Sequence, residues 1–190
     1  MRDASRVSLR SRRDDDVDVL TQLMAVTRDR DGYPPHWPPD TGRFIASRRE
    51  LASFVSEDET GAVVGHVALN ASSARPCMEL ARAATGYDDD QLGAVARLVV
   101  APQMRRHGIA RQLLEAATRR CFELGRHPIL DVVQWFDPAI ALYETAGWQR
   151  IGDVTISFRS PCSDLCSHAG NSIDSYVYIA RTPAEPTAAG

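Results

Sequence analysis

The chain contains 190 residues with a formal net charge of −3 at pH 7, and 44% of its residues are hydrophobic. This is an ordinary globular composition, and one domain with a sizeable core is the default at this length. The slight negative charge argues against nucleic acid as a partner. The first thirty residues carry no apolar stretch, and no run approaches the roughly 18 apolar residues of a membrane span, so we expect no signal peptide and no membrane partner. Four cysteines without a sign of secretion predict reduced thiols and a cytoplasmic location.

The first predicted elements are a short strand around Val7 and Leu9 and a helix that follows Asp14–Asp16. Apolar residues at three- and four-residue spacing from Val17 to Thr27 indicate one buried helix face. Acidic residues stabilise a helix start through the helix dipole, so the three aspartates are expected to cap this helix. A carboxylate cluster can also bind a metal ion, which is the alternative interpretation.

Residues 31–40 form a loop stiffened by four prolines, which fit neither a helix interior nor a central strand. Aromatic residues on a stiff loop can line a small-molecule pocket. Tyr33, His36 and Trp37 are therefore candidates for substrate contact. The alternative is that the loop is only a packed connector.

The next stretch predicts a short helix at 43–49 and two strands, at 51–56 and 62–69, joined by a turn that ends at Gly61. His66 lies within the second strand. A lone histidine in a strand is usually structural, and a catalytic or substrate role is the alternative.

Residues 70–92 contain another predicted helix, indicated by apolar residues between Met78 and Ala84 and ending near Gly86. Asp88–Asp90 follows this helix. We expect a solvated acidic run there, although such a segment near a pocket could attract a cationic amine.

The most informative stretch begins with an apolar run at 96–100, which predicts a buried strand that Pro102 ends. Apolar positions from 110 to 124 recur at helical spacing, so Arg105–Ala110 is a basic turn at the start of a helix. Helix N-termini leave N–H groups unpaired and attract anions, and arginines add charge. Gly108 would let a phosphate approach the backbone closely. The pattern predicts an anion site, although it carries neither a dinucleotide nor a P-loop fingerprint.

The remainder predicts a strand at 129–133, a helix that begins at Pro138 and is closed by Gly147, and strands at 150–158 and 175–180. We expect one domain over residues 1–181. The segment 182–190 is rich in alanine, proline and threonine, and is expected to be a disordered tail.

Cys162, Cys166 and His168 have a spacing that invites a zinc interpretation. A structural zinc site needs four ligands, and the fourth, Cys77 or Cys121, would have to come from elsewhere in the fold. A loop without metal is the simpler expectation, and no metal is predicted.

Two blocks of the sequence resemble the GNAT N-acetyltransferase family. The segment Leu98–Pro102 followed by Arg105-x-x-Gly108-x-Ala110 is similar to the family's acetyl-CoA motif, and Ala139–Trp148 is similar to a second family block at the right distance downstream. The resemblance covers about residues 5–180. It implies an α/β (α+β) fold with a mixed, mostly antiparallel, twisted sheet of about six to seven strands, splayed between the fourth and fifth and flanked by helices.

The same resemblance implies acetyl-CoA as cosubstrate. The strand backbone would hold the pantetheine arm, and the amides of the basic turn would hold the pyrophosphate. The Val100 amide takes the position of the family's oxyanion donor. The cofactor-binding residues implied in this way are Leu98, Val99, Val100, Arg105, Arg106, His107, Gly108, Ile109, Ala110 and Arg111.

Tyr143 falls on the position of the family's general acid, which would protonate the departing thiolate; its alternative is a packed aromatic. Asp131 is the candidate general base, because a carboxylate in an apolar strand is costly unless it is paired or used. Some relatives carry a glutamate there. The chain departs from many relatives at Phe136, where they have an asparagine, and it lacks a carboxylate in the strand before the turn.

By this resemblance we expect an N-acetyltransferase that moves the acetyl group of acetyl-CoA directly to a primary amine of a small molecule, such as an antibiotic, an amino acid or a polyamine. Trp135 joins Tyr33, His36 and Trp37 as an expected substrate contact, because bulky aromatic residues favour a small enclosed acceptor. The alternatives are a protein N-terminal or lysine acetyltransferase and a non-catalytic acyl-CoA sensor. Many relatives are dimers, so a homodimer is a candidate assembly.

Overall fold

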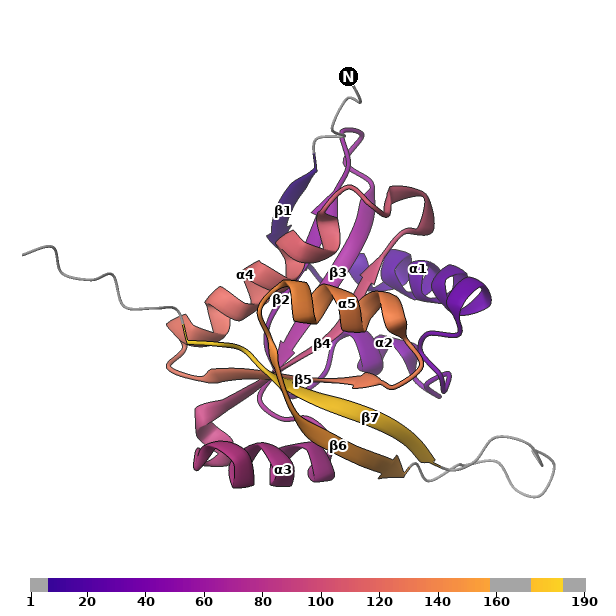
Figure 1. Ribbon diagram of the computed structural model, residues 1–190. Coiled ribbons are helices and arrows are strands. Elements are labelled where there is room, and N and C mark those ends of the chain that lie inside the picture. The colour runs from indigo at the N-terminus through magenta and orange to yellow at the C-terminus, as the bar shows by residue number, and fades with distance from the viewer. Residues whose placement is uncertain (1–6, 158–171, 183–190) are drawn as a thin grey trace, which may run out of the picture.

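A computed structural model describes residues 7–157 and 172–182 of the chain. These residues form a seven-stranded sheet with the strand order β1-β2-β3-β4-β5-β7-β6, shown in Figure 1. The strands are β1 (Ser8–Ser11), β2 (Glu50–Glu57), β3 (Val63–Asn70), β4 (Leu92–Val100), β5 (His127–Val133), β6 (Gln149–Ser157) and β7 (Ser172–Ile179). The α-helices are α1 (Asp16–Asp31), α2 (Thr41–Ile45), α3 (Arg75–Thr85), α4 (Ile109–Glu123) and α5 (Asp137–Thr145).

The sheet divides into two parts between β4 and β5. These strands are the one parallel pair among the described strands, and they pair only where Leu92–Ala94 meets His127–Ile129. Beyond Ala94 the two strands diverge, whereas all the other neighbours in the sheet are antiparallel. The predicted mixed sheet, splayed between its fourth and fifth strands, is confirmed.

Helix α4 covers one face of the sheet against β2, β3, β4 and β5. Gly93 on β4 makes this approach close, because a Cβ atom there would lie 2.4 Å from the Cys121 sulfur. Ile109 is buried, while Leu124, which the pattern assigned to the buried face, is 38% exposed. The helix begins at Ile109 and ends at Glu123, so the buried face starts one residue earlier than predicted and does not include Leu124.

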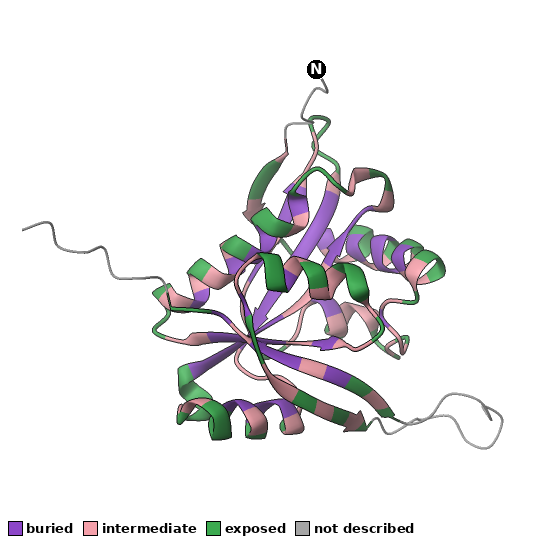
Figure 2. Ribbon diagram, in the orientation of Figure 1, coloured by how far each residue is buried: buried purple, intermediate pink, exposed green. Residues whose placement is uncertain are grey.

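The other helices complete the layers. Helix α1 packs on β3, β4 and α2, and α3 packs on β6 and β7. Figure 1 shows α1 and α2 on the side of the sheet away from α4 and α5. Buried residues, purple in Figure 2, follow the central strands and the sheet-facing sides of α1 and α4. This core fixes the two diverging strands between two helical layers.

Some element boundaries differ from the predicted ones. The helix predicted at 43–49 is α2 at Thr41–Ile45, because the Asp40 side chain accepts a hydrogen bond from the Arg43 N–H at 2.9 Å and so sets its start. Strand β4 begins at Leu92, four residues before the apolar run that predicted it. The zinc candidates Cys162, Cys166 and His168 and the tail from 183 lie outside the described residues.

An ion-pair network joins the N-terminal elements. The Arg10 guanidinium binds both carboxylate oxygens of Asp16, at 2.7 and 2.8 Å, and also the Glu57 carboxylate. These bonds hold the start of α1 against β2, so Asp16 acts within an ion-pair network. Within the described residues there is no group of three or more His, Cys, Asp or Glu side chains placed to hold a metal ion.

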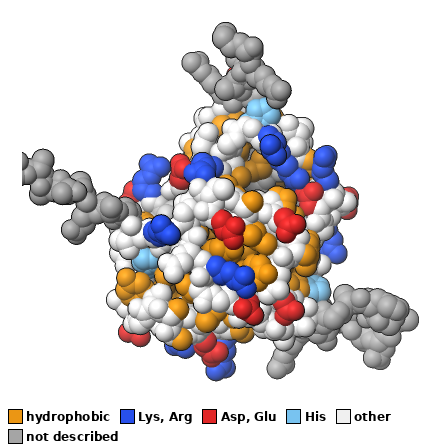
Figure 3. Space-filling model, viewed as in Figure 1, with side chains coloured by type: hydrophobic (Ala, Val, Ile, Leu, Met, Phe, Trp, Pro, Cys, Tyr) orange, Lys and Arg blue, Asp and Glu red, His pale blue; other side chains and the backbone are white. Residues whose placement is uncertain are grey.

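The described helices include none that is long and apolar enough to cross a membrane. On the face of the molecule drawn in Figure 3, basic and acidic side chains of the described residues are interspersed. No single-sign patch dominates that face, which agrees with the small net charge.

Candidate active site

The divergence of β4 and β5 opens two adjoining cavities. The turn-side cavity, about 400 Å³, extends to Arg105–Arg111, and the loop-side cavity, about 230 Å³, extends to Tyr33–His36. The residues that line both are Tyr33, Leu98, Phe136, Ala139 and Tyr143. The two cavities therefore meet at the point where β4, β5 and α5 come together. Another hollow of the described surface lies between α4 and the Ala146–Trp148 segment, and a further one lies between α1 and Pro102–Gln103.

The turn-side cavity ends at the start of α4. Arg106 and Gly108 both have left-handed backbone conformations, with φ of 69° and 79°. Gly108 adopts this conformation without strain and leaves open space, since the nearest atom to a Cβ there would be Gln112 Nε2 at 4.0 Å. The first N–H groups of a helix have no partner within the helix, and Ile109 lines the cavity here. This end of the cavity can accept an anion on backbone donors.

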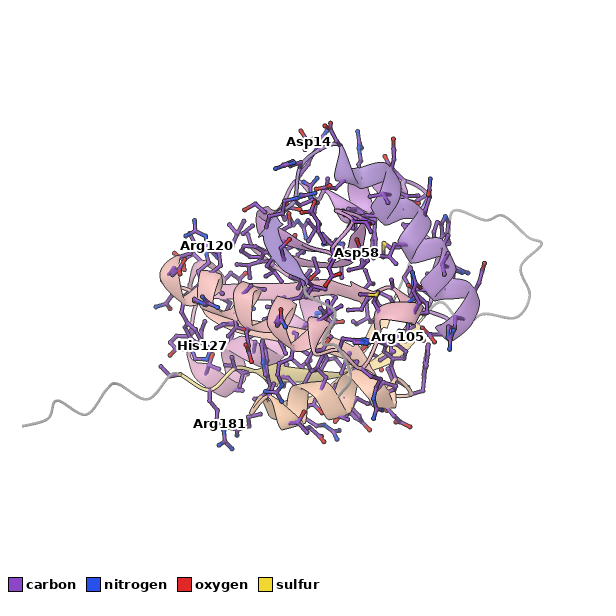
Figure 4. The ribbon with its side chains drawn as sticks, turned by 90° about the horizontal axis from the view of Figure 1, so that it is seen from above. Asp14, Asp58, Arg105, Arg120, His127 and Arg181 are labelled. Atoms are coloured by element: carbon purple, nitrogen blue, oxygen red, sulfur yellow. The ribbon has the colours of Figure 1, made fainter. Side chains whose placement is uncertain are left out.

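The arginines of the turn connect it to the neighbouring helices. Arg105 forms an ion pair with Asp31 at the end of α1, and its Nε donates to the Val100 carbonyl oxygen at 3.4 Å. Figure 4 shows Arg105 between α1 and α5. Arg111 donates to the Thr145 carbonyl oxygen of α5 at 3.0 Å. Both side chains line the turn-side cavity while holding its walls together.

The β4 backbone is irregular beside the cavities. The β3–β4 register shifts between His66 and Ala68, and Arg97 has a φ of 55°, so β4 bulges at this point. Further along, the Ala101 N–H donates to the Val64 carbonyl oxygen at 2.8 Å. Because successive strand residues alternate in direction, the Val100 N–H points away from β3 and into the gap. A backbone donor is thus available in the cavity that Tyr143 also lines.

His66 supports this bulge. Its ring is buried, with Nδ1 3.2 Å from the Arg97 carbonyl oxygen. Burial lowers the pKa of His66 from 6.5 to about 3, so the ring is neutral at pH 7 and its Nδ1–H donates to that oxygen. His66 lines neither cavity, and the structural interpretation of this strand histidine fits its position.

Tyr143 stands at the junction of the two cavities. It is a buried residue of α5, and its ring packs against those of Trp148 and Tyr178, with centroids 6.3 and 6.1 Å away. Burial raises the pKa of Tyr143 above its ordinary value of 10, and the negative charge of Asp131 acts in the same direction. The hydroxyl therefore holds its proton at neutral pH and can donate it.

Asp131 lines the loop-side cavity from β5. Its carboxylate accepts a hydrogen bond from the Ser73 hydroxyl at 2.7 Å. Burial raises the pKa of this carboxyl above its usual 3.8, against the opposing effects of the Ser73 and Cys77 hydrogen bonds and the Arg97 charge. A desolvated carboxylate of this kind is suited to accept a proton from an amine.

The four aromatic or histidine residues expected at the substrate divide into two pairs. Tyr33 lines both cavities, and His36 lines the loop-side cavity. Trp37 is 39% exposed beneath the Arg28 guanidinium, and Trp135 is 55% exposed and packs over Gly32. Neither tryptophan lines either of the two cavities, so only Tyr33 and His36 stand at the expected substrate position.

Of the cofactor residues implied by the resemblance, all but one line the turn-side cavity. The exception is His107, whose exposed ring has Nδ1 3.2 Å from the Met104 carbonyl oxygen. Phe136, in the place of the family's asparagine, stacks on Tyr33 with centroids 6.1 Å apart and forms part of the wall between the cavities. The stacked rings of Phe136 and Tyr33 thus occupy the place of the family's asparagine.

Arg97, which was not predicted as a site residue, lines the loop-side cavity. A signal was present, because a lone arginine inside an apolar strand is costly without a partner or a use. An alternating strand would have suggested that this side chain leaves the sheet with its neighbours Val95 and Val99. The bulge changes that direction, and a bulge cannot be read from one sequence.

Residues 21–148 match the sequence profile of the acetyltransferase (GNAT) family, and the chain belongs to this family. No curated protein matches the chain at a significant level.

Several solved structures share the fold. A phosphinothricin acetyltransferase of the GNAT superfamily from Sinorhizobium meliloti, in complex with acetyl-CoA, is 21% identical with a TM-score of 0.63, over 91% of this chain and 86% of that one. Arabidopsis thaliana NAA60 in complex with acetyl-CoA is 18% identical with a TM-score of 0.63, over 92% and 98%. YncA from Salmonella typhimurium with its cofactor acetyl-CoA is 16% identical with a TM-score of 0.64, over 97% and 100%.

Proposed function

We propose that this chain is an N-acetyltransferase that transfers the acetyl group of acetyl-CoA to the primary amine of a small-molecule acceptor. The observation that carries the proposal is the meeting of two cavities at Tyr143, with an anion-accepting turn at the far end of one and the Asp131 carboxylate in the other. Family membership and the neighbours crystallised with acetyl-CoA support this cosubstrate.

The turn-side cavity fits acetyl-CoA. The open space beside Gly108 and the first N–H groups of α4 suit the pyrophosphate, and the β4 segment Leu98–Val100 suits the pantetheine arm. Acetyl-CoA, when bound, supplies an activated acetyl group as a thioester. In the proposed site the Val100 N–H donates to the thioester carbonyl oxygen and stabilises the negative charge that develops there.

The residues at the junction divide the proton transfers between them. Asp131 takes a proton from the acceptor ammonium, so that the amine can attack, and its raised pKa brings it closer to the pKa of the amine. Tyr143 delivers its proton to the sulfur as the thiolate departs, and the second proton that the nitrogen loses on becoming an amide restores the tyrosine hydroxyl. The products are then the amide, the CoA thiol and the proton held by Asp131. An acid and a base that line the same cavity argue for turnover and against a sensor that only binds acyl-CoA.

The form of the loop-side cavity favours a small acceptor. It holds about 230 Å³ between β4, β5 and the Tyr33–His36 loop, a space for a compact molecule. A peptide acceptor is the second candidate, because the solved neighbours include protein N-terminal acetyltransferases, among them NAA60 of Arabidopsis thaliana, which is 19% identical with a TM-score of 0.64 in a second structure with a bisubstrate analogue. The enclosing loop, whose residues Tyr33–His36 all line the cavity, makes the small molecule the better fit.

The test is CoA-thiol release by the purified protein with acetyl-CoA and a panel of amines. The panel holds amino acids, polyamines, aminoglycosides and short peptides, and mass spectrometry of the products identifies the acetylated amine. The proposal predicts saturable, amine-dependent release with a small member. Release only with peptides would support the protein acetyltransferase, and acetyl-CoA binding without release for any amine would contradict the enzymatic proposal.

A further inference from the structure

The loop-side cavity contains a positive charge that the proposed transfer does not use. Arg97 is placed by the β4 bulge, where its φ of 55° turns the side chain from the alternation of the strand. Its guanidinium lies 4.6 Å from the centre of the Phe44 ring of α2, at the wall of the cavity. The bulge therefore brings a cation to the site where the acceptor is expected.

The donors of this guanidinium are not satisfied by the protein. Nε and Nη1 of Arg97 are buried and have no hydrogen-bond partner among the described residues. Arg10 and Arg12, by contrast, are each ion-paired with a glutamate or aspartate. A buried charged donor without a partner costs more than an ordinary unmade hydrogen bond, so an oxyanion that enters the cavity would offset that cost. Burial also lowers the pKa of Arg97, which reports the same desolvation.

The cavity carries a negative charge on its other wall. Asp131 stands on β5, across the gap from Arg97 on β4, and each charge shifts the pKa of the other group toward its charged form. Both side chains line the cavity, and no ion pair joins them in the described residues. Ser175 lines the same cavity, and its buried hydroxyl also has no partner among the described residues.

We propose that the acceptor is a zwitterion, an amine that also carries a carboxylate or a comparable oxyanion, and that Arg97 binds this oxyanion. The guanidinium offers two parallel N–H donors, which match the two oxygens of such a group. The amino group then lies toward Asp131 and the junction with Tyr143. The inference rests on the proposed N-acetyltransferase function and adds its acceptor class.

Matched acceptors test this inference. L-amino acids, ω-amino acids and aminoalkyl phosphinates are each compared with the corresponding carboxamide or decarboxylated amine, which keeps the amine and loses the negative charge. The wild type is expected to show a kcat/KM about 10²-fold higher for the anionic member, mostly through KM. Arg97→Gln removes this preference and leaves the neutral amines within about 3-fold, and Arg97→Lys restores part of it.

Arg28→Gln is the matched control, because Arg28 also carries a buried Nη1 without a partner among the described residues and stacks on an aromatic ring, yet lines neither of the two cavities. It should leave the preference for anionic acceptors unchanged.

Calorimetric binding of the same panel to the protein with CoA gives a readout that does not need turnover. Arg97-dependent binding of the anionic members without release would contradict only the enzymatic proposal. Equal kcat/KM for the anionic and neutral acceptors, or an equal loss for both in Arg97→Gln, would overturn the inference and leave acetyl transfer standing. A failure of every anionic acceptor to bind or react would also overturn it.

Discussion

The two cavities in the gap between β4 and β5 are built in different ways. The end of the turn-side cavity is a single contiguous segment, Arg105–Arg111, whose backbone offers the donors and whose arginines are anchored to α1 and α5. The loop-side cavity draws on the α1–α2 loop, α2, β4, β5, α5, β6 and β7, and its polar groups are buried side chains such as Arg97 and Asp131. Backbone chemistry within one segment can be recognised in a sequence, whereas side chains that converge from several segments cannot.

The largest effect is expected on acetyl-CoA binding in the turn-side cavity. Gly108→Glu places a negative charge and a side chain where the pyrophosphate is proposed to lie, so acetyl-CoA binding should fall below calorimetric detection. The matched control is Gly86→Glu at the end of α3, since Gly86 has a similar φ of 74° and open space around it. Both variants carry about 1–2 kcal/mol of backbone strain. Equal affinity for acetyl-CoA in the two variants would contradict the placement of the cosubstrate.

The junction between the cavities is tested by Tyr143→Phe. This change removes the proton donor, so kcat should fall about 10²–10⁴-fold, while the dissociation constant of acetyl-CoA changes little. Tyr178→Phe is the control, because it removes a neighbouring hydroxyl that donates to Glu144 and lies outside both cavities. Comparable turnover in the two variants would remove the acid role from Tyr143.

The loop side is tested by Asp131→Asn. The burial that raises the pKa of Asp131 should place the acidic limb of kcat/KM above the ordinary carboxyl value of 3.8, since the base must be deprotonated. The variant should lose this limb and about 10²-fold in kcat/KM, with water relaying part of the proton transfer. Asp131→Glu should keep a limb. Asp153→Asn, at an exposed carboxylate paired with Arg150, should leave the profile unchanged. If the acidic limb of kcat/KM persists in Asp131→Asn, it belongs to another titratable group, and the base role of Asp131 is contradicted.

The smallest effect is expected on the free energy of unfolding, because His66 supports the β4 bulge. The pKa of His66 is about 3 in the folded protein and 6.5 when exposed, so folding disfavours its protonation. Its contribution to stability is therefore fully present above pH 6.5 and is lost as the pH falls from 6.5 toward 3, by at most about 1.4 kcal/mol per pH unit. Urea unfolding of the wild type and His66→Gln at pH 7, 6 and 5 measures this loss. Parallel pH dependences would show that His66 does not titrate on unfolding.

Much of the fold could be predicted because it depends on local patterns. The strands, helix α4 and the basic turn were located within a few residues, since periodicity and turn residues determine them locally. The phase of α4 was predicted, since Leu113, Leu114, Ala117 and Cys121 are all buried, but its ends differ. The left-handed Gly108 lets the helix begin at the buried Ile109, and Leu124 lies beyond its last residue and is exposed. The strand order β5-β7-β6 depends on pairing between distant segments, and no local pattern predicted it.

The acceptor side shows where prediction from sequence ends. Tyr33, His36 and Trp37 lie on one stiff loop, yet the first two line a cavity and the third packs under Arg28. Composition predicts such a loop but not which of its sides faces inward. Arg97 depends on a bulge in β4, and its importance becomes visible only through the buried donors that lack a partner among the described residues.

Amide hydrogen exchange, followed by mass spectrometry with and without acetyl-CoA, tests most directly whether the gap between β4 and β5 is where the reactants meet. The account predicts that acetyl-CoA protects the segments that contain Leu98–Val100 and Arg106–Arg111, and that an acceptor added as well protects the Tyr33–His36 loop. Binding of acetyl-CoA that leaves these segments unprotected, or that protects only the outer surface of α1 or α4, would contradict it.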